Sequence, residues 1–224
     1  MHIGLIGGIG PAATDFYYRG LVDRYRAAGK ALELTMAHAD VGEMGRNLGA
    51  GETMKQARIF AGLIGRLKAA GAELAAVTSM GGHFCIADLL PISPLPLVHG
   101  VVAVAEEIKR RGLKTVGIIG TRTVMKSALY GALPFARVVV PEGELLDRVH
   151  ENYVGMANVG VVTDAHRLVF FEAGARLCRD QGAEAVMLGG TDLFLAFRDR
   201  DPGFPAIDCA DIHVEAIFRR AAAS

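Results

Sequence analysis

Short apolar runs alternate with longer segments of helical periodicity along the whole chain. The apolar runs predict strands at residues 2–6, 32–37, 74–77, 115–119, 137–140 and 185–188, with shorter ones at 96–98 and 206–207. Apolar residues at helical spacing predict helices at residues 14–28, 54–70, 101–111, 125–133, 145–156, 164–180 and 210–222. Strands separated by helices are typical of parallel sheets covered by helices, so we expect an α/β fold.

The second half of the chain repeats the first half. IGLIG at residues 3–7 matches VGIIG at 116–120, GAE at 71–73 matches GAE at 182–184, and PLV at 96–98 matches PAI at 205–207. The offsets drift slowly, from 113 (116 − 3) through 111 (182 − 71) to 109 (205 − 96). Chance echoes of glycine caps and apolar strands are one explanation, but similar helices follow the third match and favour duplication. We expect two parallel-sheet units related by a pseudo-twofold axis, one formed by residues 1–96 plus 209–224 and the other by 97–208.

The duplication predicts where a ligand binds. Ligands of open α/β sheets lie beyond the carboxyl ends of the strands. We therefore expect the residues after the third strand of each unit, 78–83 and 189–192, to face each other across one cleft. The offset of 111 residues pairs Ser79 with Gly190.

Composition narrows the choice of partner and compartment. Lys+Arg and Asp+Glu both number 24, so the formal net charge is zero, and we expect neither nucleic acid nor an anionic membrane surface as a partner. A charge near zero gives little protection against self-association, so we expect a homodimer. The three cysteines, Cys85, Cys178 and Cys209, form neither a disulfide framework nor a zinc motif. The N-terminus is typical of a first strand rather than a signal peptide, and no apolar run is long enough to span a bilayer, so we expect a cytoplasmic protein.

A glycine-rich turn follows the first predicted strand. GIGPAA at residues 8–13 fits the GxGxxA pattern of dinucleotide-binding turns, which by itself is a weak signal. No acidic residue ends the second predicted strand at the distance that a ribose requires, so we expect no tightly bound nucleotide. The same backbone amides suit a carboxylate ligand. Arg46 is either a clamp for that carboxylate or a solvated loop residue.

Four segments in order resemble motifs of the aspartate/glutamate racemase superfamily, the cofactor-independent amino-acid racemases. IGLIGGIGPAAT at residues 3–14 resembles the first strand and GGMGPxAT turn of that family. GTR at 120–122 with Met125 and Tyr130 is similar to its GTRxTM…Y segment, LGGTD at 188–192 resembles its LGCTE motif, and DCADIH at 208–213 resembles its DTTxIH segment. This resemblance, which runs nearly end to end, implies two α/β units around one site. It also implies chemistry without pyridoxal phosphate or metal, and a small acidic amino acid or dicarboxylate as the ligand.

The resemblance also implies positions for the functional residues. Family members use two acid/base groups, usually cysteines, on opposite faces of the substrate Cα. The first lies in a CNTxH or TNTxH motif and the second in GCT. This chain carries Ser79 and Gly190 at those two positions and keeps only His83 of the first motif. The positions implied to bind substrate are Ile9, Met80, Gly81, Thr121, Thr191, Asp208 and Cys209.

The residues at these positions leave the chemistry open. A serine needs an adjacent base to act, and a glycine offers no side-chain group, so two-thiol chemistry is not expected. His83 either holds a proton for Ser79 or bonds to backbone at the start of a helix. Asp192 is an acid of the site or, more simply, a helix N-cap. Cys209 either faces the cleft or packs as an inert side chain.

Three functions are compatible with this sequence. The first is a racemase-type isomerase that acts on or binds a small acidic amino acid or dicarboxylate, with altered or lost two-base chemistry. The second is a cofactor-free decarboxylase or lyase of the same superfamily, because stabilising one carbanion needs only one proton donor. The third is a non-catalytic ligand-binding relative. The pair Ser79 and Gly190 disfavours two-base racemisation, permits the lyase weakly and suits the non-catalytic relative.

Overall fold

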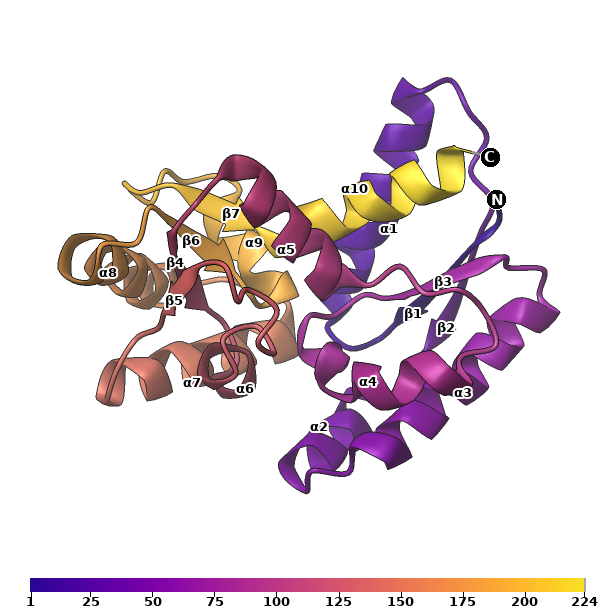
Figure 1. Cartoon of the computed structure of the whole chain (residues 1–224), viewed down its shortest axis with the longest axis horizontal. Coiled ribbons are helices and arrows are strands. Elements are labelled where there is room, and N and C mark those ends of the chain that lie inside the picture. The colour runs from indigo at the N-terminus through magenta and orange to yellow at the C-terminus, as the bar shows by residue number, and fades with distance from the viewer. Residues whose placement is uncertain (224) are drawn as a thin grey trace. The chain divides into compact units, whose positions relative to one another are not determined.

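The computed structural model describes residues 1–223, which form two compact units. Unit 1 consists of Met1–Gly100 together with the chain from His213 onward, and unit 2 consists of Val101–Ile212. The chain therefore leaves unit 1 near residue 100 and returns to it near residue 213. These positions lie close to the expected boundaries at residues 96–97 and 208–209. Figure 1 shows a separate parallel sheet in each unit.

Unit 1 is built on a three-stranded parallel sheet. Its strand order is β2 (Leu34–His38), β1 (Ile3–Gly7), β3 (Leu74–Val77). Every residue of β1 and β3 is buried, as expected for short apolar strands of a parallel sheet that is covered on both faces. The register aligns Ile3 with Leu34 on one side and with Leu74 on the other, so the carboxyl ends of the strands meet at one edge.

Helices cover both faces of the unit 1 sheet. Helix α3 (Thr53–Ala69) packs on β1 and β2, with α2 (Val41–Gly49) and the short α4 (Ile86–Leu89) beside it. Figure 1 shows α1 (Pro11–Ala27) and α10 (Cys209–Ala222) together on the side of the sheet away from α3. Three contacts join α1 to α10: an aromatic contact between Tyr25 and Phe218, an ion pair between Arg24 and Glu215, and a hydrogen bond between Tyr17 and His213.

Unit 2 is built on a four-stranded parallel sheet. Its strand order is β5 (Arg137–Val139), β4 (Thr115–Ile119), β6 (Ala185–Leu188), β7 (Ala206–Asp208). Helix α8 (Asp164–Gln181) packs on β4 and β6, and α7 (Glu144–Val159) packs against α8. Gly117 of β4 admits this close packing, because a Cβ atom there would lie 3.0 Å from the side chain of Leu177. Unit 2 also contains α5 (Gly100–Arg111), α6 (Arg122–Lys126) and α9 (Phe194–Phe197).

The same backbone hydrogen bonds occur within each of the two sheets, at positions separated by the predicted offsets. In unit 1 the amide of Thr78 donates to the Ile6 carbonyl, and in unit 2 the amide of Gly189 donates to the Ile119 carbonyl. The carboxylates of Glu73 and Glu184 each accept a backbone amide at the start of the first strand of their own unit. Ser79 and Gly190, the residues after these paired amides, therefore occupy equivalent places in their sheets. The predicted α/β fold with two parallel-sheet units is confirmed.

The structure differs from the sequence prediction in three places. The helix expected at residues 125–133 is wrong: α6 ends at Lys126, and Ala128, Leu129 and Tyr130 all have positive φ angles, which a right-handed helix excludes. The strand expected at 96–98 is reduced to a single bridge between Ala75 and Leu97. Helix α2 was not predicted, although the Asp40 carboxylate caps it by accepting the Glu43 amide.

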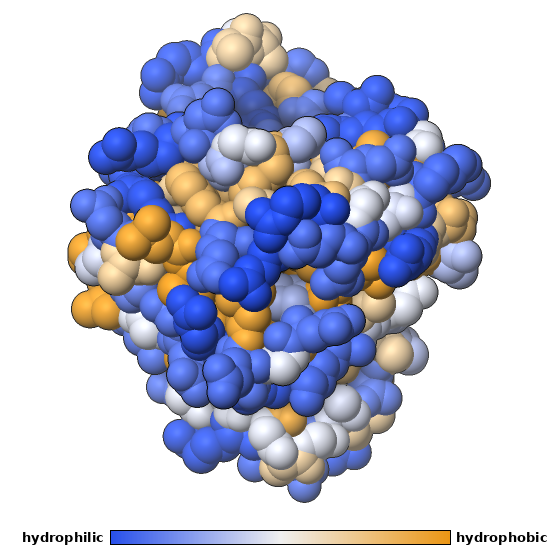
Figure 2. Space-filling model, turned by 90° about the vertical axis from the view of Figure 1, so that its left-hand side faces the viewer, coloured by the Kyte–Doolittle hydropathy of each residue, from blue (hydrophilic) through white to orange (hydrophobic). Residues whose placement is uncertain are grey.

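The surface of the described residues is mixed in character. Figure 2 shows a mostly hydrophilic face on which hydrophobic side chains form separate patches. The exposed apolar residues of unit 2 include Val159, Val161 and Leu168. Among residues 1–223 no helix combines the length and the hydrophobicity that a bilayer crossing requires.

Candidate functional site

Ser79 begins the loop that follows β3. Its side chain is buried, and its Oγ accepts a hydrogen bond from the amide of Gly82 at 3.1 Å. Its backbone carbonyl accepts a second bond, at 2.7 Å, from Nδ1 of His83. These bonds fold residues 81–85 into the 3₁₀ helix η1 (Gly81–Cys85) directly after the strand. The Ser79 hydroxyl is thus fixed at the carboxyl end of the unit 1 sheet.

His83 is a buried neutral imidazole with both ring nitrogens engaged. Nδ1 donates to the Ser79 carbonyl, so Nε2 must be the acceptor for the amide of Gly100 at 3.1 Å. Burial lowers the pKa of His83 to about 3, and the neighbouring His213 and His99 add to the effect. A neutral ring whose two nitrogens are both hydrogen-bonded to backbone groups cannot serve as a base for the Ser79 hydroxyl near pH 7. Of the two roles open from the sequence, the geometry therefore favours the backbone-bonding one.

A second buried histidine lies beside the first. Nε2 of His213 donates to the Val98 carbonyl at 2.9 Å, and Nδ1 accepts the hydroxyl proton of Tyr17 at 2.8 Å. Burial lowers the pKa of His213 to about 4. The ring centroids of His83 and His213 are 5.8 Å apart, and that of His99 lies 5.1 Å from His83. Together the imidazoles of His83 and His213 hold segment 98–100, where the chain leaves unit 1.

The bond between Tyr17 and His213 gives a stability prediction. Replacing Tyr17 by Phe leaves the buried Nδ1 acceptor of His213 without its donor. We expect the free energy of unfolding to fall by about 1–3 kcal/mol in urea denaturation. The neighbouring Tyr18 is exposed, and Tyr18→Phe should change it by less than about 0.5 kcal/mol. Equal effects of the two substitutions would contradict this role for Tyr17.

In unit 2 the residue equivalent to Ser79 is Gly190, and an aromatic ring lies against it. An ideal Cβ atom on Gly190 would lie only 2.2 Å from Cε2 of Tyr153. The Tyr153 hydroxyl donates to Oδ2 of Asp192 at 3.2 Å, and all three side chains of Tyr153, Thr191 and Asp192 are buried. Burial raises the pKa of Tyr153 well above its usual range, and the nearby Asp192 raises it further. The N-cap position of the 3₁₀ helix η3 (Thr191–Leu193) is held by Gly190, and Asp192 is the second residue of this helix.

The thiols of this chain are poor acid/base groups. Cys209 is completely buried at the start of α10, and burial raises its pKa far above the usual range. Burial likewise raises the pKa of Cys85 to about 12. Asp208, next to Cys209, accepts the amides of Ala210 and Asp211 and so caps α10, and burial raises its pKa to about 6. The structure therefore favours the inert packing role for Cys209.

The remaining residues expected to bind a ligand lie after the strands, except for Arg46. Ile9 and Met80 are buried beside the carboxyl ends of the unit 1 strands, and Gly81 begins η1. Thr121 follows β4 and caps α6 by accepting the Val124 amide. Arg46 is exposed on α2, the helix that the sequence did not predict, which favours a solvated role over a carboxylate clamp.

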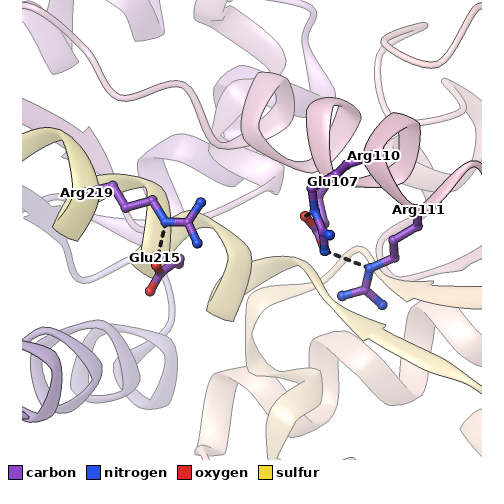
Figure 3. Close-up of polar contacts among 5 residues, drawn as sticks. All are labelled: Glu107, Arg110, Arg111, Glu215 and Arg219. Carbon is purple, nitrogen blue, oxygen red and sulfur yellow. Dashed lines mark hydrogen bonds and ion pairs between the residues drawn. The ribbon is translucent and has the colours of Figure 1, made fainter.

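A further set of polar contacts consists of ion pairs on helix surfaces. Glu107 accepts hydrogen bonds from Arg110 and Arg111, and Glu215 accepts one from Arg219 at 2.6 Å. Figure 3 draws these five side chains. The hydrogen bonds from Arg110 and Arg111 hold the pKa of Glu107 down at about 2 despite its partial burial. Each group joins residues one turn apart on one helix, which is typical of helix-surface stabilisation rather than of a ligand site. Within residues 1–223 no cluster of three or more His, Cys, Asp or Glu side chains is arranged to hold a metal ion.

Comparison with known proteins shows the family to which this fold belongs. The family model of the Asp/Glu/Hydantoin racemases matches residues 6–217, and the chain belongs to that family. A Yersinia pestis protein named only as a candidate Asp/Glu racemase is 25% identical, with a TM-score of 0.85 over 99% of this chain and 100% of that one. An aspartate racemase homologue from Pyrococcus horikoshii is 27% identical, with a TM-score of 0.81 over 99% of each chain. The glutamate racemase of Francisella tularensis, solved with D-glutamate, shares the fold at 16% identity, a TM-score of 0.69, and 99% and 81% coverage.

Proposed function

We propose that this chain is a racemase-type isomerase of the Asp/Glu/Hydantoin racemase family that acts on or binds a small acidic amino acid or dicarboxylate. It works without pyridoxal phosphate or metal, and its two-base chemistry is altered. Family membership and the glutamate racemase solved with D-glutamate support the ligand class. One observation carries the altered chemistry: the equivalent positions 79 and 190 hold a hydroxyl and no side chain, in place of two thiols.

The groups near these positions support the same conclusion. A two-base racemase needs one group to remove the Cα proton and another to return it from the opposite face. His83 is neutral and bonded to backbone, the Cys209 thiol has a raised pKa, and Tyr153 retains its proton at neutral pH. None of them supplies the thiolate that the family reaction uses.

A cofactor-free lyase is the second candidate function. The Ser79 hydroxyl accepts the Gly82 amide and keeps its own proton to donate. A reaction that stabilises one carbanion and protonates it from one side requires a single donor of this kind. Release of carbon dioxide from an acidic substrate would favour this candidate over the isomerase.

Ligand binding is the first experimental test. In isothermal titration calorimetry we expect heat from at least one of L-aspartate, D-aspartate, L-glutamate, D-glutamate, malate and succinate. Ser79→Ala should weaken that binding, because it removes a hydroxyl fixed at the carboxyl end of β3. The matched control Ser93→Ala removes a hydroxyl that bonds only to the nearby Leu95 carbonyl, and it should leave the affinity unchanged. If all six compounds fail to bind, or if the two variants weaken binding equally, the proposal is wrong.

A further inference from the structure

Gly190 is a glycine for reasons of space rather than of backbone conformation. Its φ of −107° and ψ of 125° lie in the extended region that any residue adopts. A Cβ atom there would meet three ring atoms of Tyr153, Cε2 at 2.2 Å, Cζ at 2.5 Å and Cδ2 at 2.9 Å. Those distances are far below van der Waals contact, so no larger side chain fits at position 190 while the Tyr153 ring stays where it is.

The Tyr153 ring is held firmly in this place. It projects from α7, where Leu146, Val149, Tyr153 and Met156 form the buried face of the helix. Its hydroxyl bonds to the carboxylate of Asp192, which is itself 1% exposed. Moving the ring away would leave a buried carboxylate without this donor, which is costly in a protein interior.

From this geometry we infer that Tyr153 is the specificity-determining residue at the carboxyl end of the unit 2 sheet. Its ring occupies the space that a thiol at position 190 would need, and Gly190 and Tyr153 form a size-matched pair. The carboxyl end of the unit 2 sheet then offers a ligand a neutral hydroxyl in place of an acid/base group. This inference rests on the proposed function for its ligand, while the size-matched pair itself is tested without any ligand.

The thermal stability of four variants tests the size-matched pair. Gly190→Ala should lower the midpoint of thermal unfolding by roughly 2–12 °C, because the added methyl group overpacks against the ring. Tyr153→Ala should also lower it, through the cavity that it leaves. The double variant Gly190→Ala/Tyr153→Ala should be no less stable than Tyr153→Ala alone. Gly155→Ala is the matched control on the same helix, since a Cβ atom there meets nothing within 4 Å, and it should raise the midpoint by about 2–4 °C.

Two thermal results would overturn the inference. One is a Gly190→Ala midpoint within about 1 °C of the parent chain, which is less than the smallest shift expected for an overpacked core. The other is a pair of single effects that simply add in the double variant, since independent sites add and a shared space does not.

A proton-exchange experiment distinguishes a failure of the size-matched pair from a failure of the proposed function. Two variants are compared for exchange of the Cα proton of aspartate in deuterated water: Ser79→Cys/Gly190→Cys, which keeps Tyr153, and Ser79→Cys/Gly190→Cys/Tyr153→Ala. We expect at least a ten-fold faster exchange from the variant without the ring. Equal, measurable exchange from both would overturn the inference. Non-additive stabilities together with no exchange from either variant would support the size-matched pair and contradict the proposed ligand.

Discussion

Between pH 7 and pH 4 the free energy of unfolding should fall by about 3 kcal/mol for each of the two buried histidines, His83 and His213. In the unfolded chain both titrate near 6.5, whereas in the folded chain their pKa values are lowered to about 3 and about 4. A depressed pKa contributes stability that is present above the unfolded value and lost as the pH falls toward the folded one. The loss should therefore begin near pH 6.5 and be nearly complete between pH 3 and pH 4.

The main physical cause of this loss is the burial of the two rings, and the hydrogen bonds that their unprotonated nitrogens accept act in the same direction. Protonating Nε2 of His83 would place its new N–H against the Gly100 amide, and protonating Nδ1 of His213 would place its new N–H against the Tyr17 hydroxyl proton. His99, the nearest other titratable ring, also has a lowered pKa, because of burial, and acts in the same direction. Asp208 acts in the opposite direction, since its pKa is raised to about 6 and the folded chain binds its proton first.

Urea denaturation at a series of pH values measures this effect. His83→Gln keeps a donor and an acceptor but cannot be protonated. Between pH 6 and pH 4.5 it should therefore reduce the slope of the free energy of unfolding against pH by an amount equivalent to about one proton. His38→Gln, at an exposed histidine of the same unit, is the matched control and should follow the parent chain. If His83→Gln and the parent chain showed the same slope, His83 would not be the buried neutral imidazole described here.

The largest expected effect concerns catalysis. Racemisation of aspartate and glutamate by the parent chain should be slower than that of a two-thiol enzyme by at least about 10²–10⁴-fold, the usual cost of losing one positioned acid or base. Position 79 has a hydroxyl without an available base, and position 190 has no side chain at all. Chiral chromatography of long incubations with each single enantiomer measures this rate. The two-cysteine, Tyr153→Ala variant is the comparison, because two cysteines added alone would meet the ring at position 190.

Most of the sheet was predictable from the sequence. The strands at residues 74–77, 115–119 and 185–188 lie where the apolar runs predicted them, because a buried parallel strand shows a short, unbroken hydrophobic run. The failed helix at 125–133 shows the limit of this reasoning. Its apolar residues have helical spacing, but Ala128, Leu129 and Tyr130 adopt left-handed conformations that no periodicity reveals. Helix α2 was missed because Gly42, Gly45 and Gly49 make its nine residues similar to a loop.

The candidate site was predictable only in part, for a related reason. Resemblance and the internal repeat pointed to Ser79 and Gly190, since motifs and offsets are properties of the linear chain. Tyr153 was missed because its contact with Gly190 is tertiary, and its spacing in α7 marks it only as a core-facing residue. The pairing of Tyr17 with His213, from opposite ends of the chain, was missed in the same way. Two small residues in sequence at Gly189 and Gly190 were the one available sign that another side chain approaches closely.

The most direct test of altered two-base chemistry is exchange of the Cα proton of L-aspartate and L-glutamate in deuterated water, followed by ¹H NMR. The parent chain, at saturating ligand and neutral pH, should lose the Cα proton signal at least about 10²-fold more slowly than the two-cysteine, Tyr153→Ala variant. Exchange at more than roughly one turnover per second, which is within the range of ordinary enzymes, would contradict this result. The contradiction would be complete if that exchange persisted in Cys209→Ala and His83→Gln, because acid/base groups would then lie elsewhere in the chain.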